Sequence, residues 1–139
     1  MSLALSYACA QEALRAALQK AAEMNITVAV AVVDDKGAPV ALGRMDGARY
    51  FTSEVAMGKA KASAMFGRPS GRLAENVPDP IKAGASNATG GHPIFWQGAV
   101  PIMLDGGVAG AIGASGSSSE NDEIVSQAGV DAALATVAG

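Results

Sequence analysis

The chain has 139 residues, half of them apolar, and a formal net charge of -3. This length supplies one domain with its own core and is too short for two ordinary ones, so we expect a single domain over residues 1–139. The ten lysines and arginines form no basic stripe, which argues against a nucleic-acid partner. No apolar run reaches the roughly 20 residues needed to cross a bilayer, so we expect no membrane partner.

The N-terminal residues and the number of cysteines indicate the cellular compartment in which the protein is expected. Residues 1–10 are weakly apolar but lack the positive segment with which a secretory signal begins, so we expect no such signal. Cys9 is the single cysteine and cannot form an internal disulfide. Both observations favour a cytoplasmic location.

The first part of the chain predicts a helix followed by a β-hairpin. Residues 10–23 repeat apolar side chains at the 3.6-residue period of an amphipathic helix. Residues 26–33 are a β-branched run without charge, which is typical of a central strand covered on both faces. Residues 34–37, Asp-Asp-Lys-Gly, predict a turn, and residues 39–45 predict the returning strand.

The middle of the chain predicts a second helix and a long irregular segment. Ser53 is expected to cap a helix over residues 54–66, and Gly67-Arg68-Pro69 is expected to end it. Residues 70–89 are interrupted by proline and glycine and show no clear period, so we expect a loop. Long loops inside small domains often carry function.

The next segment predicts three strands, at residues 93–96, 99–104 and 108–114. Asp105-Gly106 separates the last two, and this dipeptide between apolar runs is a strong hairpin signal because both central residues need a positive φ. The three strands would add to the first hairpin and give a sheet of about five strands.

A helix over residues 120–137 is expected to close the chain, with Ser119 and Asp122 forming an approximate capping box. The order of elements is then α-ββ-α-βββ-α. This order predicts an α+β fold in which helices pack on the faces of an antiparallel sheet.

Four motifs in this order resemble the GlcG/HbpS family, which also supplies the C-terminal domain of PduO-type proteins. They are Arg-Met-Asp-Gly-Ala at residues 44–48, Lys-Ala-Lys-Ala at 59–62, Gly90-Gly91, and Gly-Ala-Ile-Gly-Ala-Ser-Gly at 110–116. The resemblance implies a profilin-like fold, assembly into homo-oligomers and, in several members, haem binding that is sometimes linked to haem degradation. Residues 91–98 depart from the usual pattern by carrying both His92 and Trp96, which leaves open a different ligand or an enzyme.

His92 is the only histidine, so zinc sites built on two or more imidazoles are excluded and we expect no metal-ion site beyond haem iron. One imidazole can bind haem iron, or act as a general acid or base near neutral pH. The ring follows the glycine-lined edge at Gly91 and precedes a proline, a position that suits a side chain projecting into a cleft. A plain surface-loop histidine is an equally good interpretation.

Arg44 and Asp46 flank one residue where a strand ends, so both side chains are expected on the same side of that strand. They can pair with each other, which would be purely structural. Alternatively, the Arg44 guanidinium can bind a carboxylate, such as a haem propionate or a small acid.

Three further side chains are candidates for ligand contacts. Lys59, on the middle helix, is by default a solvated lysine, with ligand binding as the alternative. Tyr50 can donate a hydrogen bond to a ligand or simply pack. Trp96, beside Phe95, belongs either to the core, to a subunit contact or to a pocket wall, and the enrichment of aromatics at interfaces favours an oligomer contact or a pocket there.

Ser115 lies in a Gly- and Ser-rich segment that enters the last helix. Free backbone N–H groups at such a helix start attract anions, so a carboxylate or phosphate can bind there. The segment lacks the lysine of a P-loop, so nucleotide binding is not supported. Ser115 as a nucleophile would need His92 as its base.

Three hypotheses follow for function. The first is an oligomeric ligand-binding protein with haem as the leading ligand, bound near His92, Arg44 and Gly91. The second is an enzyme of the lyase, isomerase or hydrolase type that acts on a small anionic or aromatic metabolite in a catabolic pathway, with His92 as acid-base and Arg44 as carboxylate clamp. The third is a non-catalytic accessory subunit.

Overall fold

The computed structural model describes residues 5–138. The expectation that residues 1–10 form no secretory signal concerns in part residues 1–4, which lie outside the described residues. In chain order the elements are α1 (Tyr7–Glu23), β1 (Ala29–Asp34), β2 (Pro39–Arg44), α2 (Thr52–Phe66), α3 (Ser70–Asn76), α4 (Asp79–Ala88), β3 (Ala99–Leu104), β4 (Gly107–Ser115) and α5 (Ser119–Ala138). None of the described helices has the length and apolar character needed to span a bilayer.

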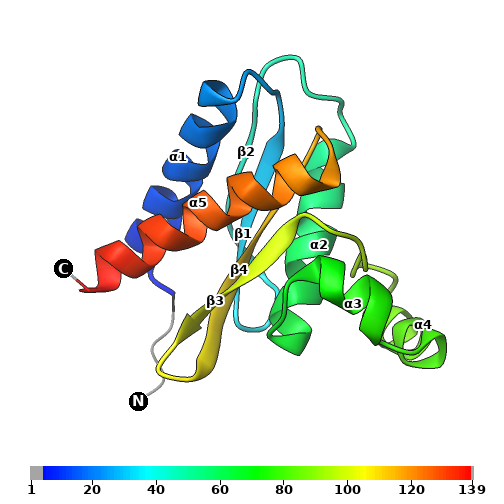
Figure 1. Cartoon of the computed structure of the whole chain (residues 1–139). Helices are drawn as coiled ribbons and strands as arrows, with labels where there is room; N and C mark the ends of the chain where they lie inside the picture. Colours follow the sequence, from blue (N-terminus) through cyan, green and yellow to red (C-terminus); the bar gives the residue numbers. More distant parts are fainter. Residues whose placement is uncertain (1–4, 139) are drawn as a thin grey trace.

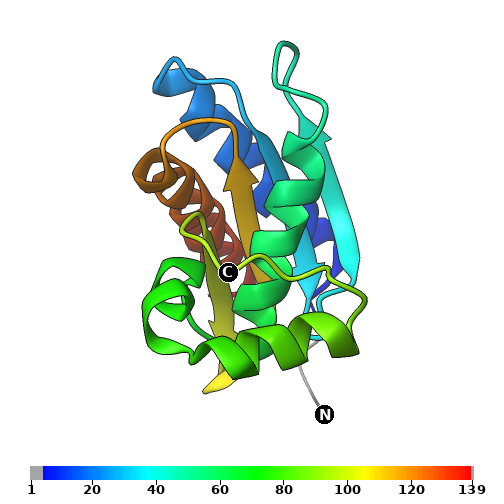
Figure 2. The ribbon, with the colours of Figure 1, turned by 90° about the vertical axis from the view of Figure 1, so that its right-hand side faces the viewer.

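The strands form one antiparallel sheet in the order β2-β1-β4-β3. Helices α1 and α5 cover one face and α2 covers the other (Figure 1). Figure 2 shows this layering after a 90° turn, with α3 and α4 at one end of α2. The predicted α+β architecture with helices on both faces of an antiparallel sheet is confirmed.

Strand β1 explains why both faces of the sheet are buried. Val30 and Val32 pack in the large core under α1 and α5. Ala29 and Ala31 point to the opposite face, where they meet Ala56 of α2. Because side chains alternate along a strand, the run of valines and alanines makes one thick and one thin apolar layer. The thin layer brings α2 close to the sheet.

Gly113 of β4 sets the distance between α2 and the sheet. A Cβ at this position would overlap the carbonyl oxygen of Ala56 and come within 2.9 Å of the backbone nitrogen of Ala60. Only glycine therefore allows the backbone of α2 to approach the strand this closely.

The predicted strand over residues 93–96 is wrong, and the sheet has four strands instead of five. This segment runs along α2, where the Ile94 N–H donates to the carbonyl oxygen of Gly58 over 2.9 Å. Pro93 has no N–H to offer to a neighbouring strand. The chain therefore lines the outer side of a helix before it enters β3 at Ala99.

The irregular segment predicted over residues 70–89 is also wrong, because it contains α3 and α4. Pro69 and Pro78 stand directly before these helices, and Pro80 occupies the first turn of α4. Proline is tolerated there because the first N–H groups of a helix have no partner within it. The prolines begin helices instead of preventing them.

The helix caps differ from the predicted ones. Ser53 lies inside α2, which has no side-chain cap, while the Thr52 hydroxyl donates to the carbonyl oxygen of Arg49 over 2.6 Å. At the start of α5, it is the hydroxyl of Ser118, not of Ser119, that accepts an N–H, from Asn121. Serine-rich starts offer several candidate caps, and sequence spacing did not select the right one.

Replacing Gly113 with alanine should lower the free energy of unfolding by about 1–3 kcal/mol, because the added methyl group forces the backbone of α2 away from β4. Gly84→Ala is the matched control: Gly84 lies in α4 with nothing within 4 Å of an added Cβ. That change should raise stability by about 0.5–1 kcal/mol through helix propensity. Urea unfolding measures both, and equal effects would contradict this packing.

Candidate functional site

A hollow of about 480 Å³ lies on the outer side of α2, between this helix and the segment that carries His92. We call it the His92 hollow. It is lined by Phe51, Glu54, Val55, Met57, Gly58, Lys61, Gly91, His92 and Ile94. Its wall is largely apolar, and its ionisable groups are one imidazole, one ammonium and one carboxylate.

Helix periodicity explains which residues of α2 reach the hollow. Glu54, Gly58 and Lys61 are spaced four and three residues apart, so they share one face of the helix. Ala56 and Ala60 face the sheet instead. One helix therefore closes the core with one face and builds a cavity wall with the other.

Gly58 allows the His92 segment to approach α2. A Cβ here would lie 2.6 Å from Cγ1 of Ile94 and 2.8 Å from the carbonyl oxygen of His92. The Ile94 N–H donates to the Gly58 carbonyl over 2.9 Å and fixes this contact. The hollow depends on this contact for its second wall.

His92 is exposed and stands at a boundary between two hollows. Gly90 and Gly91 precede it with φ of 77° and 85°, values that favour glycine. A smaller hollow of about 180 Å³ shares His92 and Lys61 with the first and adds Lys36. His92 therefore borders two hollows: the larger has a mainly apolar wall, and the smaller is lined by two lysines, Lys36 and Lys61.

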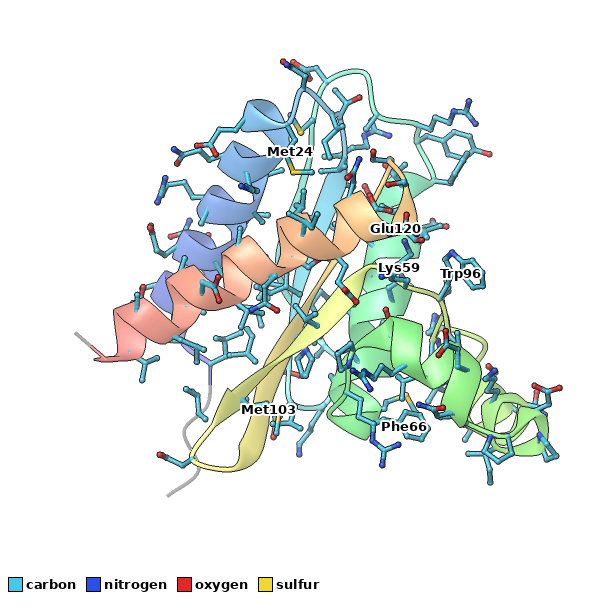
Figure 3. The ribbon with its side chains drawn as sticks, in the orientation of Figure 1. Met24, Lys59, Phe66, Trp96, Met103 and Glu120 are labelled. Carbon is cyan, nitrogen blue, oxygen red and sulfur yellow. The ribbon has the colours of Figure 1, made fainter. Side chains whose placement is uncertain are left out.

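Lys59 is buried, so the interpretation as a solvated lysine is wrong. Its Nζ lies 3.3 Å from Oδ2 of Asp122 and donates to the carbonyl oxygen of Ala114 over 3.1 Å. The two charged side chains are only 5% and 3% exposed. Figure 3 shows Lys59 extending from α2 toward the beginning of α5, where Glu120 is labelled. The ion pair ties α2 to α5 past the end of β4.

Asp122 takes the place of the external anion that the sequence suggested for the start of α5. Its Oδ1 accepts the N–H of Ser117 over 3.1 Å, and Gly116 also donates a backbone hydrogen bond to this carboxylate. Burial raises the pKa of the Asp122 carboxyl, while Lys59 and these N–H groups act in the opposite direction. The anion bound at this helix start is the chain's own side chain.

The structure does not bring Arg44 to His92. Arg44 is exposed on the edge strand β2, it lines neither of the hollows beside His92, and within residues 5–138 it forms no ion pair with Asp46. Lys61 is the cation that lines both hollows with His92, and its Nζ donates to the carbonyl oxygen of Gly37 over 3.0 Å. The sequence analysis missed this residue, because its spacing from Glu54 and Gly58 shows only that the three share a helix face and not that this face lines a cavity.

The remaining predicted residues are separated as well. Tyr50 is 83% exposed and packs edge-on against Phe51. Trp96 is 61% exposed, and Figure 3 shows its ring extending outward from the ribbon. Ser115 lines a different hollow from His92, so the structure does not assemble a serine nucleophile with its base. Of the predicted set, only Gly91 and His92 line the His92 hollow.

Comparisons with known proteins agree with this architecture. The family model described as "Haem degrading protein HbpS-like" matches residues 5–131. The chain is 30% identical over 113 residues to Protein GlcG of Escherichia coli K12, and the match covers 80% of this chain and 81% of GlcG. It is also 28% identical over 131 residues to the corrinoid adenosyltransferase PduO of Salmonella typhimurium, but spans only 39% of that protein.

Two solved structures show the same fold. The Klebsiella pneumoniae protein ORFY superposes with a TM-score of 0.86 at 26% identity, covering 97% of this chain and 94% of ORFY. PduOC, solved as a complex with haem, superposes with a TM-score of 0.82 at 28% identity, covering 94% and 95%. The fold and its site define a small α+β protein with a cavity beside one helix. The chain belongs to the HbpS-like family.

Asp122→Asn should lower the free energy of unfolding by about 3–5 kcal/mol, because it leaves the Lys59 ammonium buried without a counter-charge. Glu12→Gln is the matched control, since Glu12 pairs with Arg15 on the exposed surface of α1. That change should cost less than about 1 kcal/mol. Urea unfolding compares the two, and an Asp122→Asn protein as stable as Glu12→Gln would show that the buried pair contributes nothing.

Proposed function

We propose that this chain binds haem and that the His92 hollow receives it. The observation that carries the proposal is the placement of the chain's single imidazole at the rim of an apolar cavity. Neutral imidazole is a common axial ligand of haem iron. His92 is exposed, so its ring is accessible to a ligand.

The residues around the cavity fit the chemistry of haem. The apolar side chains of Phe51, Val55 and Ile94 suit the flat porphyrin, and Met57 adds a polarisable thioether to the same wall. A volume of about 480 Å³ is typical of a small-molecule site.

Haem also carries two propionates, for which the site has matching charge. Lys61 and Lys36 line the smaller hollow that adjoins His92, and they supply positive charge where carboxylates would extend out of an apolar cavity. From the sequence, Arg44 was the candidate for this role, with a purely structural pairing to Asp46 as the alternative. The structure favours Lys61 because it lines both hollows.

The protein's part in this site is to bind and orient, while bound haem would supply the redox and ligand chemistry of its iron. The solved complex of PduOC with haem supports the proposal, since the two chains share their fold. A profilin-like classification, a homo-oligomeric state and a cytoplasmic location stay predictions. An enzyme that uses His92 as acid-base and a non-catalytic accessory subunit also stay predictions.

Titration of the purified protein with haem tests the proposal. We expect a saturable shift of the Soret band for the natural chain. His92→Ala should weaken haem binding by at least roughly tenfold. Losing a residue that only hydrogen-bonds to a metal ligand already lowers metal affinity by about that factor, and His92 would be the ligand itself. Lys61→Ala should weaken binding less, since it removes charge but not the iron ligand.

Trp96→Ala is the matched control, because Trp96 is an exposed ring on the same segment and does not line the cavity. It should bind haem as the natural chain does. Absence of a Soret shift in the natural chain would contradict haem binding. Equal binding by His92→Ala and the natural chain would contradict the assigned ligand.

A further inference from the structure

A second hollow, of about 380 Å³, lies on the other side of Phe51, and we call it the Ser115 hollow. It is lined by Thr27, Gly47, Ala48, Arg49, Phe51, Thr52, Ser115, Gly116 and Ser117. These residues come from the segment before β1, the loop between β2 and α2 with the first residue of α2, and the end of β4 with the two residues after it. Phe51 is the wall that it shares with the His92 hollow.

The charge of the Ser115 hollow is positive. Arg49 is the one ionisable residue among those that line it, and no acidic residue is among them. Within residues 5–138, the Arg49 guanidinium forms no ion pair. A guanidinium that borders a polar cavity without an acidic partner is available to an external anion.

Ser115 adds an independent indication of a ligand. The residue is 8% exposed, and within residues 5–138 its hydroxyl takes part in none of the side-chain hydrogen bonds. In the described part of the chain, no polar side-chain atom is both sealed from solvent and unpaired. The Ser115 oxygen is therefore in contact with solvent, and the residue lines this hollow, so its hydroxyl is available to a ligand there.

Two neighbouring polar residues, Thr52 and Ser117, already form hydrogen bonds within the protein. The Thr52 hydroxyl donates to the Arg49 carbonyl over 2.6 Å. The Ser117 hydroxyl accepts from Asn121 over 3.2 Å, and the Ser117 N–H is taken by Asp122. The start of α5 is thus not the binding element. Among the lining side chains within residues 5–138, those of Arg49, Ser115 and the exposed Thr27 are left to bind a ligand, and Arg49 alone is charged.

We propose that the Ser115 hollow binds a small oxyanion, a carboxylate or a phosphate, through the Arg49 guanidinium and the Ser115 hydroxyl. The guanidinium matches two oxygens of such a group in a charge-assisted, two-pronged contact. The hydroxyl donates a third hydrogen bond from inside the hollow. This site is distinct from the haem site and does not depend on it, because the two hollows share only Phe51.

NMR titration of the haem-free, ¹⁵N-labelled chain tests this site with two probes, sodium acetate and inorganic phosphate, each against sodium chloride at matched ionic strength. We expect saturable shifts of the Arg49 Nε–H and of the Ser115 and Gly116 amides with at least one probe. The probe that binds more tightly shows whether the site prefers a carboxylate or a phosphate. Haem titration is a separate measurement, so failure of one proposal does not imply failure of the other.

Arg49→Gln should weaken the binding of the effective probe by roughly tenfold or more, as expected for the loss of a charged hydrogen-bonding partner. Ser115→Ala should weaken it by a smaller factor. Arg44→Gln is the matched control, because Arg44 is an exposed arginine that does not line the hollow. It should bind the probe as the natural chain does.

Two results would overturn the proposal. One is the absence of saturable shifts at these groups with both probes. The other is an equal loss of affinity in Arg49→Gln and Arg44→Gln, which would indicate general charge attraction. Thermal unfolding of each variant confirms that it is folded, and both arginines are exposed, so neither substitution disturbs the core.

Discussion

The close approach of two backbones to helix α2, one on each side, is the constraint on which the rest of the structure depends. On the inner side, Gly113 lets β4 lie against Ala56 and Ala60. On the outer side, Gly58 lets the segment around Ile94 do the same. Glycine is needed at both contacts because a single methyl group would overlap backbone or neighbouring atoms. The helix is therefore a shared wall, part of the core on one face and of the His92 hollow on the other.

The same helix also carries the buried cation that organises the beginning of α5. Lys59 pairs with Asp122, which in turn accepts N–H groups from residues 116 and 117. Because this carboxylate already accepts the N–H groups just before α5, we assign an external anion to Arg49 and Ser115. The two hollows thus divide the chemistry: one offers an imidazole and an apolar wall, and the other offers a guanidinium and a hydroxyl.

Hydrophobic period and turn chemistry were sufficient to predict the hairpins and the three long helices, since these depend on local pattern. The family resemblance rested instead on four short motifs and their order along the chain. Sequence could not show that Lys59 is buried while Lys61 lines the hollow. Lys59 and Lys61 are two positions apart on α2, so their side chains point in different directions. Which of them meets Asp122 depends on how α5 packs against α2, and local sequence does not show this packing. Similarly, the sequence does not distinguish the charges of Arg44 and Arg49, and the path of the loop between β2 and α2 brings Arg49, but not Arg44, to the Ser115 hollow. The segment at 93–96 was misassigned because its partner is a helix and not a strand.

The most direct test of this account is amide hydrogen exchange in the Gly58→Ala variant. The account predicts that the Ile94 amide loses its protection, because the added methyl group pushes this segment from α2, while the Ala111 amide in β4 keeps its protection. Haem binding should be lost together with the Ile94 protection. An Ile94 amide that exchanges as slowly as in the natural chain, with haem binding intact, would show that the outer wall of the His92 hollow does not depend on this contact.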